Sequence, residues 1–358
     1  MRIAFVNATR KWGGVKTWCL DMASALEAQG HAAWIFGRRG EFVAKASRLG
    51  LRARGVWFGF DFNPFCVFYF LYFFLTRRVD VVVVNVAKDL RTAGLAARLL
   101  GRQIVQHVGS GGDFDDIRMV RLVQRLLRPR LLCCSDYVRE RILIHVPSMR
   151  GQEVHALHPG VRVPESPSFA AHTPPVVIAT SQLNADKHHA DLLLALARLK
   201  AAGVPFRAVI AGTGSLAAEL KAQATALGLD DRLEWTGFTV DVQGVLRGGD
   251  VFVLPTLVEP LGIALEEAMA AGLAPVARAA GGVPEIWPEA CRAYLTPPAD
   301  GPEGLEKALR LLLALPWEER QAVRRAAWEH ARARFNLPDQ AARFARWMAQ
   351  ALPRPKHS

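Results

Sequence analysis

The fold is decided by the stretch Glu259-Pro260-Leu261-Gly262-Ile263-Ala264-Leu265-Glu266-Glu267-Ala268-Met269-Ala270-Ala271-Gly272. The apolar run Val251–Pro255 precedes it and predicts a buried strand. Helix-forming residues then carry the chain from Gly262 to Gly272, where a glycine is a natural helix stop. A strand, a short loop and a helix in this order predict an α/β unit whose loop leads into the start of the helix.

The start of this helix has the chemistry of a phosphate site. Its first backbone N–H groups are unpaired, and the positive end of the helix dipole lies there. Gly262 lets the backbone approach a ligand closely. Glu259 on the loop and Glu267, expected two turns into the helix, can accept hydrogen bonds from hydroxyl groups on either side of a diphosphate. This pattern indicates a nucleotide sugar. A solvated pair of glutamates on an amphipathic helix explains neither the glycines nor the order of elements.

The rest of the chain repeats the alternation of strand and helix. Its 358 residues favour two domains, and 51% hydrophobic with 22% charged residues is typical of a folded protein. Short β-rich runs separated by helical patterns predict parallel sheets with crossover helices. The expected strands are Arg2–Asn7, Ala32–Phe36, Val79–Asn85, Gln103–His107, Leu131–Ser135, Val154–His158, Val176–Ser181, Phe206–Ala211, Leu233–Gly237, Val251–Pro255 and Ala274–Ala277.

The decisive stretch resembles the E-x7-E signature of the retaining glycosyltransferases of family 4. The match includes the Pro-x-Gly after Glu259, the Glu-Ala-Met-Ala around Glu267 and the downstream Gly281-Gly282-Val283-Pro284-Glu285. The resemblance implies the α/β GT-B fold, in which two Rossmann-like domains with parallel sheets face each other across a cleft. It also implies that Glu259 holds the transferred sugar and Glu267 the ribose. The backbone of Leu261-Gly262-Ile263-Ala264 is then expected at the diphosphate.

A proline-rich stretch divides the chain, and the resemblance implies the course of its last helix. We expect an acceptor-binding domain at 1–163, a proline-rich linker at 164–175 and a nucleotide-sugar-binding domain at 176–335. The last segment, 336–358, is expected to form a helix that crosses back to the first domain.

Further donor residues are expected in the second half. A lysine at position 187, between a strand and a helix, can neutralise a leaving diphosphate, although a solvated lysine at a helix start is the alternative. The family usually has an arginine where this chain has Gln182, which can donate a hydrogen bond but carries no charge. Gly212 and Gly214 resemble the family's Gly-x-Gly beside the donor.

Two residues are singled out in the first half. Gly14 follows the first strand, in the loop that faces the ligand crevice of an α/β domain. His107 ends another strand, where the family carries a histidine near the sugar being transferred. It can orient a hydroxyl or assist proton transfer from the acceptor, although a lone histidine can also be structural.

No cofactor and no metal are expected. Asp113-Phe114-Asp115-Asp116 has the Asp-x-Asp spacing of metal-dependent sugar transferases, but aspartates also favour helix starts, and that interpretation is preferred. The five cysteines lack metal-ligand spacing and are expected to be buried free thiols.

The formal charge of +12 predicts an anionic partner. No nucleic-acid-binding motif is present, so phosphate ligands or an anionic membrane remain. Arg118, Arg121, Arg125 and Arg128 form a basic stripe at helical spacing, with a solvated face as the alternative. The aromatic run 64–75 spans only about 18 Å as a helix, short of the roughly 30 Å hydrocarbon core, so it is either a buried crossover helix or an interfacial one.

These observations predict an enzyme that moves a sugar from a nucleotide-diphosphate sugar to a lipid-linked or saccharide acceptor, such as a lipopolysaccharide or surface-polysaccharide precursor. The N-terminus lacks the segments of a signal peptide, so we expect a cytoplasmic protein on the inner face of the membrane. A nucleotide-sugar epimerase of the same fold and a non-catalytic peripheral membrane protein remain as alternatives.

Overall fold

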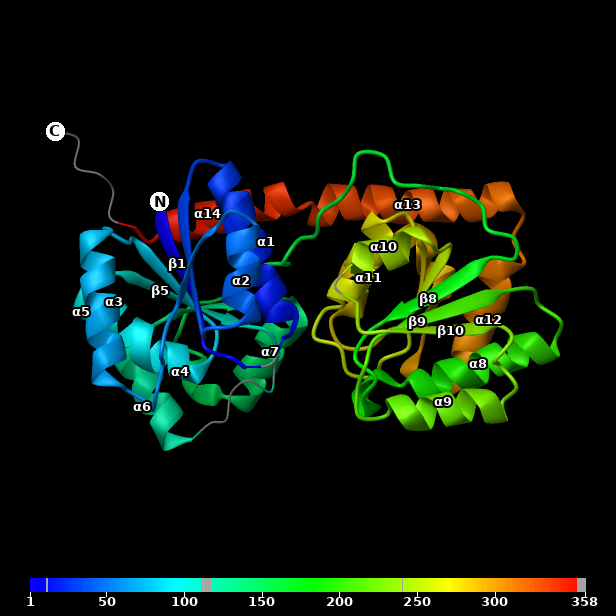
Figure 1. The fold of residues 1–358 in the computed structure, drawn as a ribbon, viewed down its shortest axis with the longest axis horizontal. Coiled ribbons are helices and arrows are strands. Elements are labelled where there is room, and N and C mark those ends of the chain that lie inside the picture. Colours follow the sequence, from blue (N-terminus) through cyan, green and yellow to red (C-terminus); the bar gives the residue numbers. More distant parts are fainter. Residues whose placement is uncertain (11, 111, 113–116, 240, 353–358) are drawn as a thin grey trace. The chain divides into compact units, whose positions relative to one another are not determined.

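The computed structural model describes residues 1–10, 12–110, 112, 117–239 and 241–352 (Figure 1). The chain folds into two compact units. Unit 1 comprises Met1–Gly160 and Leu337–Ser358, and unit 2 comprises Val161–Asn336. The segment 164–175, expected as a linker, therefore belongs to unit 2, and the terminal helix belongs to unit 1.

The described residues of unit 1 form a seven-stranded parallel sheet in the order β3-β2-β1-β4-β5-β6-β7. The central strand β4 reads Val-Val-Val-Val and is buried on both faces, as expected for the middle of a parallel sheet. The strands are β1 (Arg2–Asn7), β2 (Ala32–Gly37), β3 (Arg52–Gly55), β4 (Val81–Val84), β5 (Gln103–Val108), β6 (Arg130–Cys133) and β7 (Val154–Ala156).

Helices cover both faces of this sheet. Ile3 and Phe5 point to one face, where α1 (Gly14–Ala28), α2 (Glu41–Arg48) and α14 (Leu337–Ala349) pack. Ala4 and Val6 point to the other, with α3 (Pro64–Thr76), α5 (Leu95–Leu99) and α6 (Arg118–Leu127). The remaining helical segments are α4 (Ala87–Asp89), the π-helical turn η1 (Leu90–Gly94), α7 (Asp136–His145) and the 3-10 turn η2 (Pro147–Met149).

The described residues of unit 2 form a six-stranded parallel sheet in the order β10-β9-β8-β11-β12-β13. The strands are β8 (Val176–Thr180), β9 (Arg207–Ala211), β10 (Leu233–Gly237), β11 (Val251–Leu254), β12 (Ala274–Arg278) and β13 (Leu295–Thr296). The helical segments are η3 (Ala185–Lys187), α8 (His189–Ala201), α9 (Ala217–Ala226), α10 (Val242–Arg247), α11 (Ile263–Ala270), η4 (Val283–Ile286), η5 (Glu289–Tyr294), η6 (Pro298–Asp300), α12 (Gly301–Leu313) and α13 (Trp317–Phe335).

The strand order reverses once in each sheet. In unit 1 the chain winds outward in both directions from the pair β1 and β4, and in unit 2 from the pair β8 and β11. The loops that leave the carboxyl ends of such a pair run to opposite faces and open a crevice, which is where α/β sheets bind ligands. The fold thus points to the loop after β8 and the loop after β11 in unit 2.

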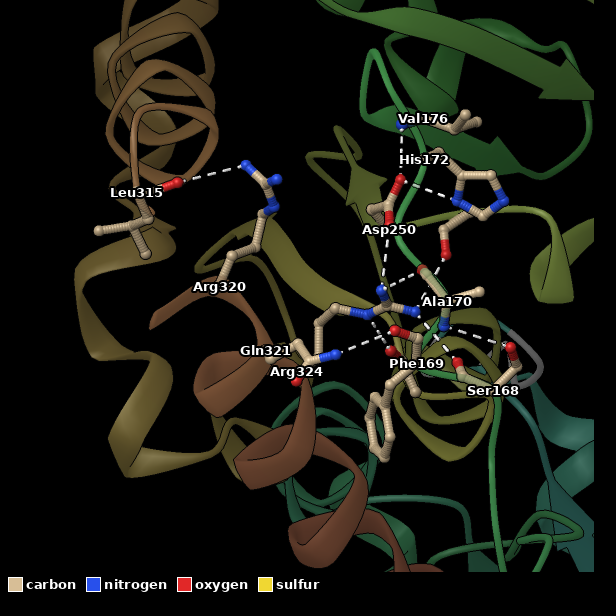
Figure 2. A network of polar contacts seen from close by, with 12 residues as sticks. Ser168, Phe169, Ala170, His172, Val176, Asp250, Leu315, Arg320, Gln321 and Arg324 are labelled. Atoms are coloured by element: carbon tan, nitrogen blue, oxygen red, sulfur yellow. Dashed lines mark hydrogen bonds and ion pairs between the residues drawn. The ribbon is translucent and has the colours of Figure 1, made fainter. Parts of the chain in front are cut away.

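At the opposite, amino end of the unit 2 sheet, a buried ion pair fastens several segments together (Figure 2). The guanidinium of Arg324 on α13 lies 3.0 Å from Asp250 and donates to the carbonyls of Ser168, Ala170, Gly249 and Gly272. The second oxygen of Asp250 accepts from the backbone N–H of Val176 and lies 3.0 Å from Nδ1 of His172. The segment 164–175 is held to the sheet through these bonds.

Candidate active site

The reversal point of unit 2 brings together two of the predicted residues. Nζ of Lys187, at the end of η3, lies 3.0 Å from Oε2 of Glu259 in the loop after β11. Both side chains are largely buried, with 21% and 13% of their surface exposed. The two residues lie in the loops that follow the adjacent strands β8 and β11, so the strand order brings them into contact.

Two buried side chains fix these loops to each other. The hydroxyl of Thr256 donates to the carbonyl of Asp186 at 3.0 Å. Arg278, at the end of β12, is fully buried; its Nη2 pairs with Asp191 of α8 at 2.6 Å and its Nη1 donates to the carbonyl of Pro255 at 2.8 Å. Arg278 was not among the residues predicted from the sequence. A charged residue at the end of an otherwise apolar, buried strand was the available signal, because such a charge needs a partner.

Glycines let neighbouring loops touch at this end of the sheet. A Cβ on Gly281 would lie 1.9 Å from the carbonyl oxygen of Glu259, and Gly282 donates its N–H to that same oxygen. A Cβ on Gly212 would lie 1.9 Å from the carbonyl oxygen of Ser181, and one on Gly214 would lie 2.3 Å from that of Leu183. The predicted donor residues Gly212 and Gly214 thus have a packing role in these loops.

Helix α11 begins at this crevice. Gly262 is its N-cap residue with φ +109, a conformation that favours glycine. Leu261 and Gly262 are buried, whereas Ile263 and Ala264 are half-buried at the first turn. Glu267 lies in the second turn, closer to the helix start than the two full turns expected from the sequence, and is half-buried.

The neighbouring Glu266 is fully buried, and neither of its carboxylate oxygens has a hydrogen-bond partner among the described residues. Burial, followed by the charge of Glu267, raises the pKa of Glu266 well above the usual range of a carboxyl group. Gln182, by contrast, is exposed on the loop after β8, where its side-chain oxygen accepts from Asn184 at 3.0 Å.

In unit 1, His107 is buried at the end of β5 and stacks on Trp18, with ring centroids 3.9 Å apart and planes 13° apart. Burial lowers the pKa of His107 to about 3, so the imidazole is neutral near pH 7. A group with this pKa is a weak base, which favours the orienting role over proton transfer. Gly14 is the exposed first residue of α1.

His107 borders a pocket of about 280 Å³ within unit 1. The pocket lies at the carboxyl ends of β1, β4 and β5, beside the reversal point, and η1 and α6 form its other walls. Its polar lining side chains are Thr9, Asn85, Arg91, Gln106, His107 and Gln124. Gln124 lies on α6, the helix of the arginine stripe, and was not among the residues predicted from the sequence.

The segment 113–116, for which a helix start was preferred over a metal site, lies outside the described residues. Among the residues that the structure does describe, no group of three His, Cys, Asp or Glu side chains is placed to hold a metal ion. All five cysteines are buried thiols outside any disulfide bond, as predicted.

Helix α3 of unit 1 has one buried face and one exposed face. Cys66, Phe70 and Phe74 of α3 are buried, whereas Phe65, Phe68 and Tyr72 point outward with 68–74% of their surface exposed. Within the described part of the chain, no helix is long and apolar enough to cross a membrane. Helix α3 is therefore neither wholly buried nor a span.

Helix α6 also has one exposed face, which is basic and apolar. Arg118, Arg121 and Arg125 are exposed together with the apolar side chains of Met119, Leu122 and Leu126. Arg128 is the C-cap residue of α6, in the left-handed conformation. Because α3 and α6 pack on the same face of the sheet, their outward stripes lie on the same side of unit 1.

Comparisons with known proteins agree with this architecture. The family described as Glycosyl transferases group 1 matches residues 165–330, and Glycosyltransferase Family 4 matches residues 12–164. A GDP-mannose-dependent alpha-(1-6)-phosphatidylinositol dimannoside mannosyltransferase of Mycobacterium tuberculosis is 31% identical over 274 residues, which cover 72% of this chain and 67% of that protein. A putative colanic acid biosynthesis glycosyltransferase of Escherichia coli is 30% identical over 48% of this chain and 44% of its own length.

Solved structures share the fold over the whole chain. A glycosyltransferase from Rickettsia africae superposes with a TM-score of 0.83 at 16% identity, covering 100% of this chain and 99% of its own. The Anabaena protein HepE in complex with UDP-glucose gives 0.76 at 21% identity, covering 98% and 100%. Two parallel-sheet α/β units with these neighbours define the GT-B fold, and with the two family matches the chain belongs to the group 1 glycosyltransferases.

Proposed function

We propose that this glycosyltransferase moves a sugar from a nucleoside-diphosphate sugar to a saccharide or lipid-linked acceptor, with retention of the anomeric configuration. The observation that carries the proposal is the Lys187–Glu259 pair at the reversal point of unit 2, beside the start of α11. The bond to be broken joins the sugar to the diphosphate. The cation of Lys187 suits the diphosphate, and the carboxylate of Glu259 suits a hydroxyl of the sugar. Relatives bind such donors: UDP-glucose is bound in HepE, and GDP-mannose is named for the mycobacterial enzyme.

Each residue of the proposed donor site contacts a different part of the nucleotide sugar. The N–H groups of the first turn of α11, together with Lys187, take the charge of the departing diphosphate. Lys187 then exchanges its partner, so Glu259 accepts a hydrogen bond from the sugar. Glu267 accepts from the ribose, and Gln182, Gly212 and Gly214 border the donor.

The chemistry balances without a covalent intermediate. The bond between the anomeric carbon and the diphosphate oxygen breaks, and the acceptor hydroxyl oxygen bonds to the same face of that carbon. The hydroxyl proton goes to the leaving diphosphate oxygen. Retention is inferred from the family resemblance, and the anomeric configuration of the product, read by NMR, tests it.

We propose that no metal is required, since Lys187 and α11 supply the positive charge. Full activity in EDTA supports this. Loss of activity in EDTA that manganese or magnesium restores contradicts it and makes Asp113–Asp116 the preferred metal ligands.

We further propose that the enzyme works as a peripheral protein on the anionic inner face of the cytoplasmic membrane. The outward stripes of α3 and α6 support this, because exposed aromatic side chains insert at the interface and arginines attract anionic lipid by about 1 kcal/mol each. Relatives are named for a phosphatidylinositol glycolipid and for colanic acid. Sedimentation with anionic liposomes should fall with salt and weaken when Arg118, Arg121 and Arg125 are changed to Gln; no binding at low salt contradicts it.

The decisive experiment is a donor screen with UDP-, GDP- and ADP-sugars, with and without a lipid extract. Nucleoside diphosphate release with a transfer product supports the transferase. Donor consumption without any transfer product indicates the epimerase instead. Liposome binding with no donor consumed indicates a non-catalytic membrane protein.

A further inference from the structure

The pocket of unit 1 contains polar groups that the protein itself leaves unsatisfied. Gln124 is 3% exposed and His107 is 5% exposed, so both are almost wholly buried. Among the described residues, Oε1 of Gln124 and Nδ1 of His107 have no hydrogen-bond partner. A buried polar atom without a partner costs about 1–3 kcal/mol, so its retention in a pocket wall points to a ligand that supplies the partner.

A hydrogen bond between the side-chain amides of Gln124 and Gln106 fixes the orientation of Gln124. Nε2 of Gln124 donates to Oε1 of Gln106 at 2.7 Å, which fixes the Gln124 side chain on the pocket wall and leaves its own oxygen to accept. Leu90, Val120 and Val123 supply apolar surface around these groups. Fixed hydrogen-bonding groups beside apolar surface suit a sugar ring, which has hydroxyl edges and an apolar C–H face.

The charge of the pocket favours a neutral ligand. Arg91 is the charged side chain of the lining, and its guanidinium lies 2.9 Å from Asp61. The buried imidazole of His107 is neutral near pH 7. Asp61 thus already balances the charge of Arg91, and the Nε of Arg91, which has no partner among the described residues, can donate to a neutral hydroxyl. Burying the unpaired charge of a phosphate here would be costly.

The size limits the ligand further. Pockets that enclose drug-sized molecules begin at about 300 Å³. About 280 Å³ therefore suits a single ring better than an oligosaccharide or a lipid tail.

We propose that this pocket binds one uncharged sugar ring of the acceptor, with Gln124 and His107 as its hydrogen-bonding partners. This inference rests on the proposed transferase function and names its acceptor class: a saccharide or glycolipid with a neutral sugar at the accepting end, in place of a phosphate-terminated lipid.

Saturation-transfer NMR on the full chain tests the proposal, with methyl mannoside, glucoside, galactoside and N-acetylglucosaminide as probes and the 6-phosphates of the same sugars as competitors. At least one methyl glycoside should bind, and its 6-phosphate should bind at least tenfold more weakly. The double variant Gln106→Leu/Gln124→Leu should lose at least tenfold in affinity. It removes both partners of one hydrogen bond, so it leaves no orphaned amide and should fold. Gln350→Leu on the surface is the matched control.

Nucleoside diphosphate release from the donor is measured in the same samples without acceptor. If donor turnover persists while no methyl glycoside binds, the pocket assignment is wrong and the transferase proposal stands. The same holds if the double variant binds like the wild type, or if the 6-phosphates bind more tightly. If glycosides bind in a Gln124-dependent way but no donor is consumed, the pocket assignment stands and the transferase proposal is wrong.

Discussion

The two ends of the unit 2 sheet each contain a buried arginine paired with an aspartate, and they differ in how completely the arginine is satisfied. At the amino end all three guanidinium nitrogens of Arg324 donate, and Asp250 is as buried as its partner. At the carboxyl end Arg278 pairs with the partly exposed Asp191, and its Nε has no partner among the described residues. The amino end is a closed network of bonds, whereas at the carboxyl end Arg278 links the loop after β11 to α8, beside the donor site that we propose.

The largest expected effect is at the carboxyl end, where Glu259→Ala removes the partner of Lys187. Turnover should fall at least 100-fold, because the contact to the sugar strengthens as the glycosidic bond breaks. Glu267→Ala should instead raise the donor KM with a smaller change in kcat. Steady-state kinetics with the donor found in the screen separates the two. Unchanged kinetics in both variants would remove this loop from the site.

The second prediction compares the two arginines directly. Arg278→Lys and Arg324→Lys each keep the charge but lose the fork that bonds several acceptors at once. Both should lower Tm by several degrees, since part of the few kcal/mol of a buried ion pair is lost.

When assayed well below both Tm values, only Arg278→Lys should lower kcat, by about tenfold, because it loosens the loops of Lys187 and Glu259. Arg324→Lys should keep wild-type kcat and KM. Equal losses of kcat in the two variants would mean that Arg278 has no positioning role.

A third prediction concerns Glu266, the unpaired carboxyl group of α11. Because its pKa is raised in the folded protein, the folded state holds the proton. Its contribution to stability is present below the ordinary carboxyl pKa of about 4.3 and is lost as pH rises through the raised pKa. Glu266→Gln should therefore match the wild-type Tm near pH 4 and exceed it increasingly toward pH 8. Glu289→Gln, at an exposed position, is the control and should show no such trend.

The smallest effect is expected at Gln182. Gln182→Arg restores the charge usual in the family on an exposed loop, where solvent screens it. Donor affinity measured by calorimetry should rise about two- to fivefold at low salt and less at high salt. A weaker affinity would place Gln182 away from the diphosphate.

Buried strands and the helix start at Gly262 could be predicted from the sequence, because apolar runs and glycine positions are local signals. Strand β3 was missed, since Arg52-Ala53-Arg54-Gly55 lies at the sheet edge and has half-exposed, charged residues. Strand β13 was missed because two residues carry no periodicity.

The site was predictable only in part for a different reason. Lys187 and Glu259 are 72 positions apart, and their contact follows from the strand order. Arg278 and Gln124 were missed because burial and unsatisfied atoms are properties of the packed chain. In the sequence Gln124 looks like an ordinary surface residue, and the one signal for Arg278 is its position at the end of an apolar strand.

We propose above all that Lys187 and Glu259 together form the donor site. Nucleoside diphosphate release from UDP-, GDP- and ADP-sugars by the wild type, Lys187→Ala, Glu259→Ala and Arg324→Lys tests it most directly. We expect release by the wild type with at least one donor, similar release by Arg324→Lys, and at least a 100-fold loss in the other two variants. Release by Lys187→Ala and Glu259→Ala at the wild-type rate, or no release from any donor, would contradict it.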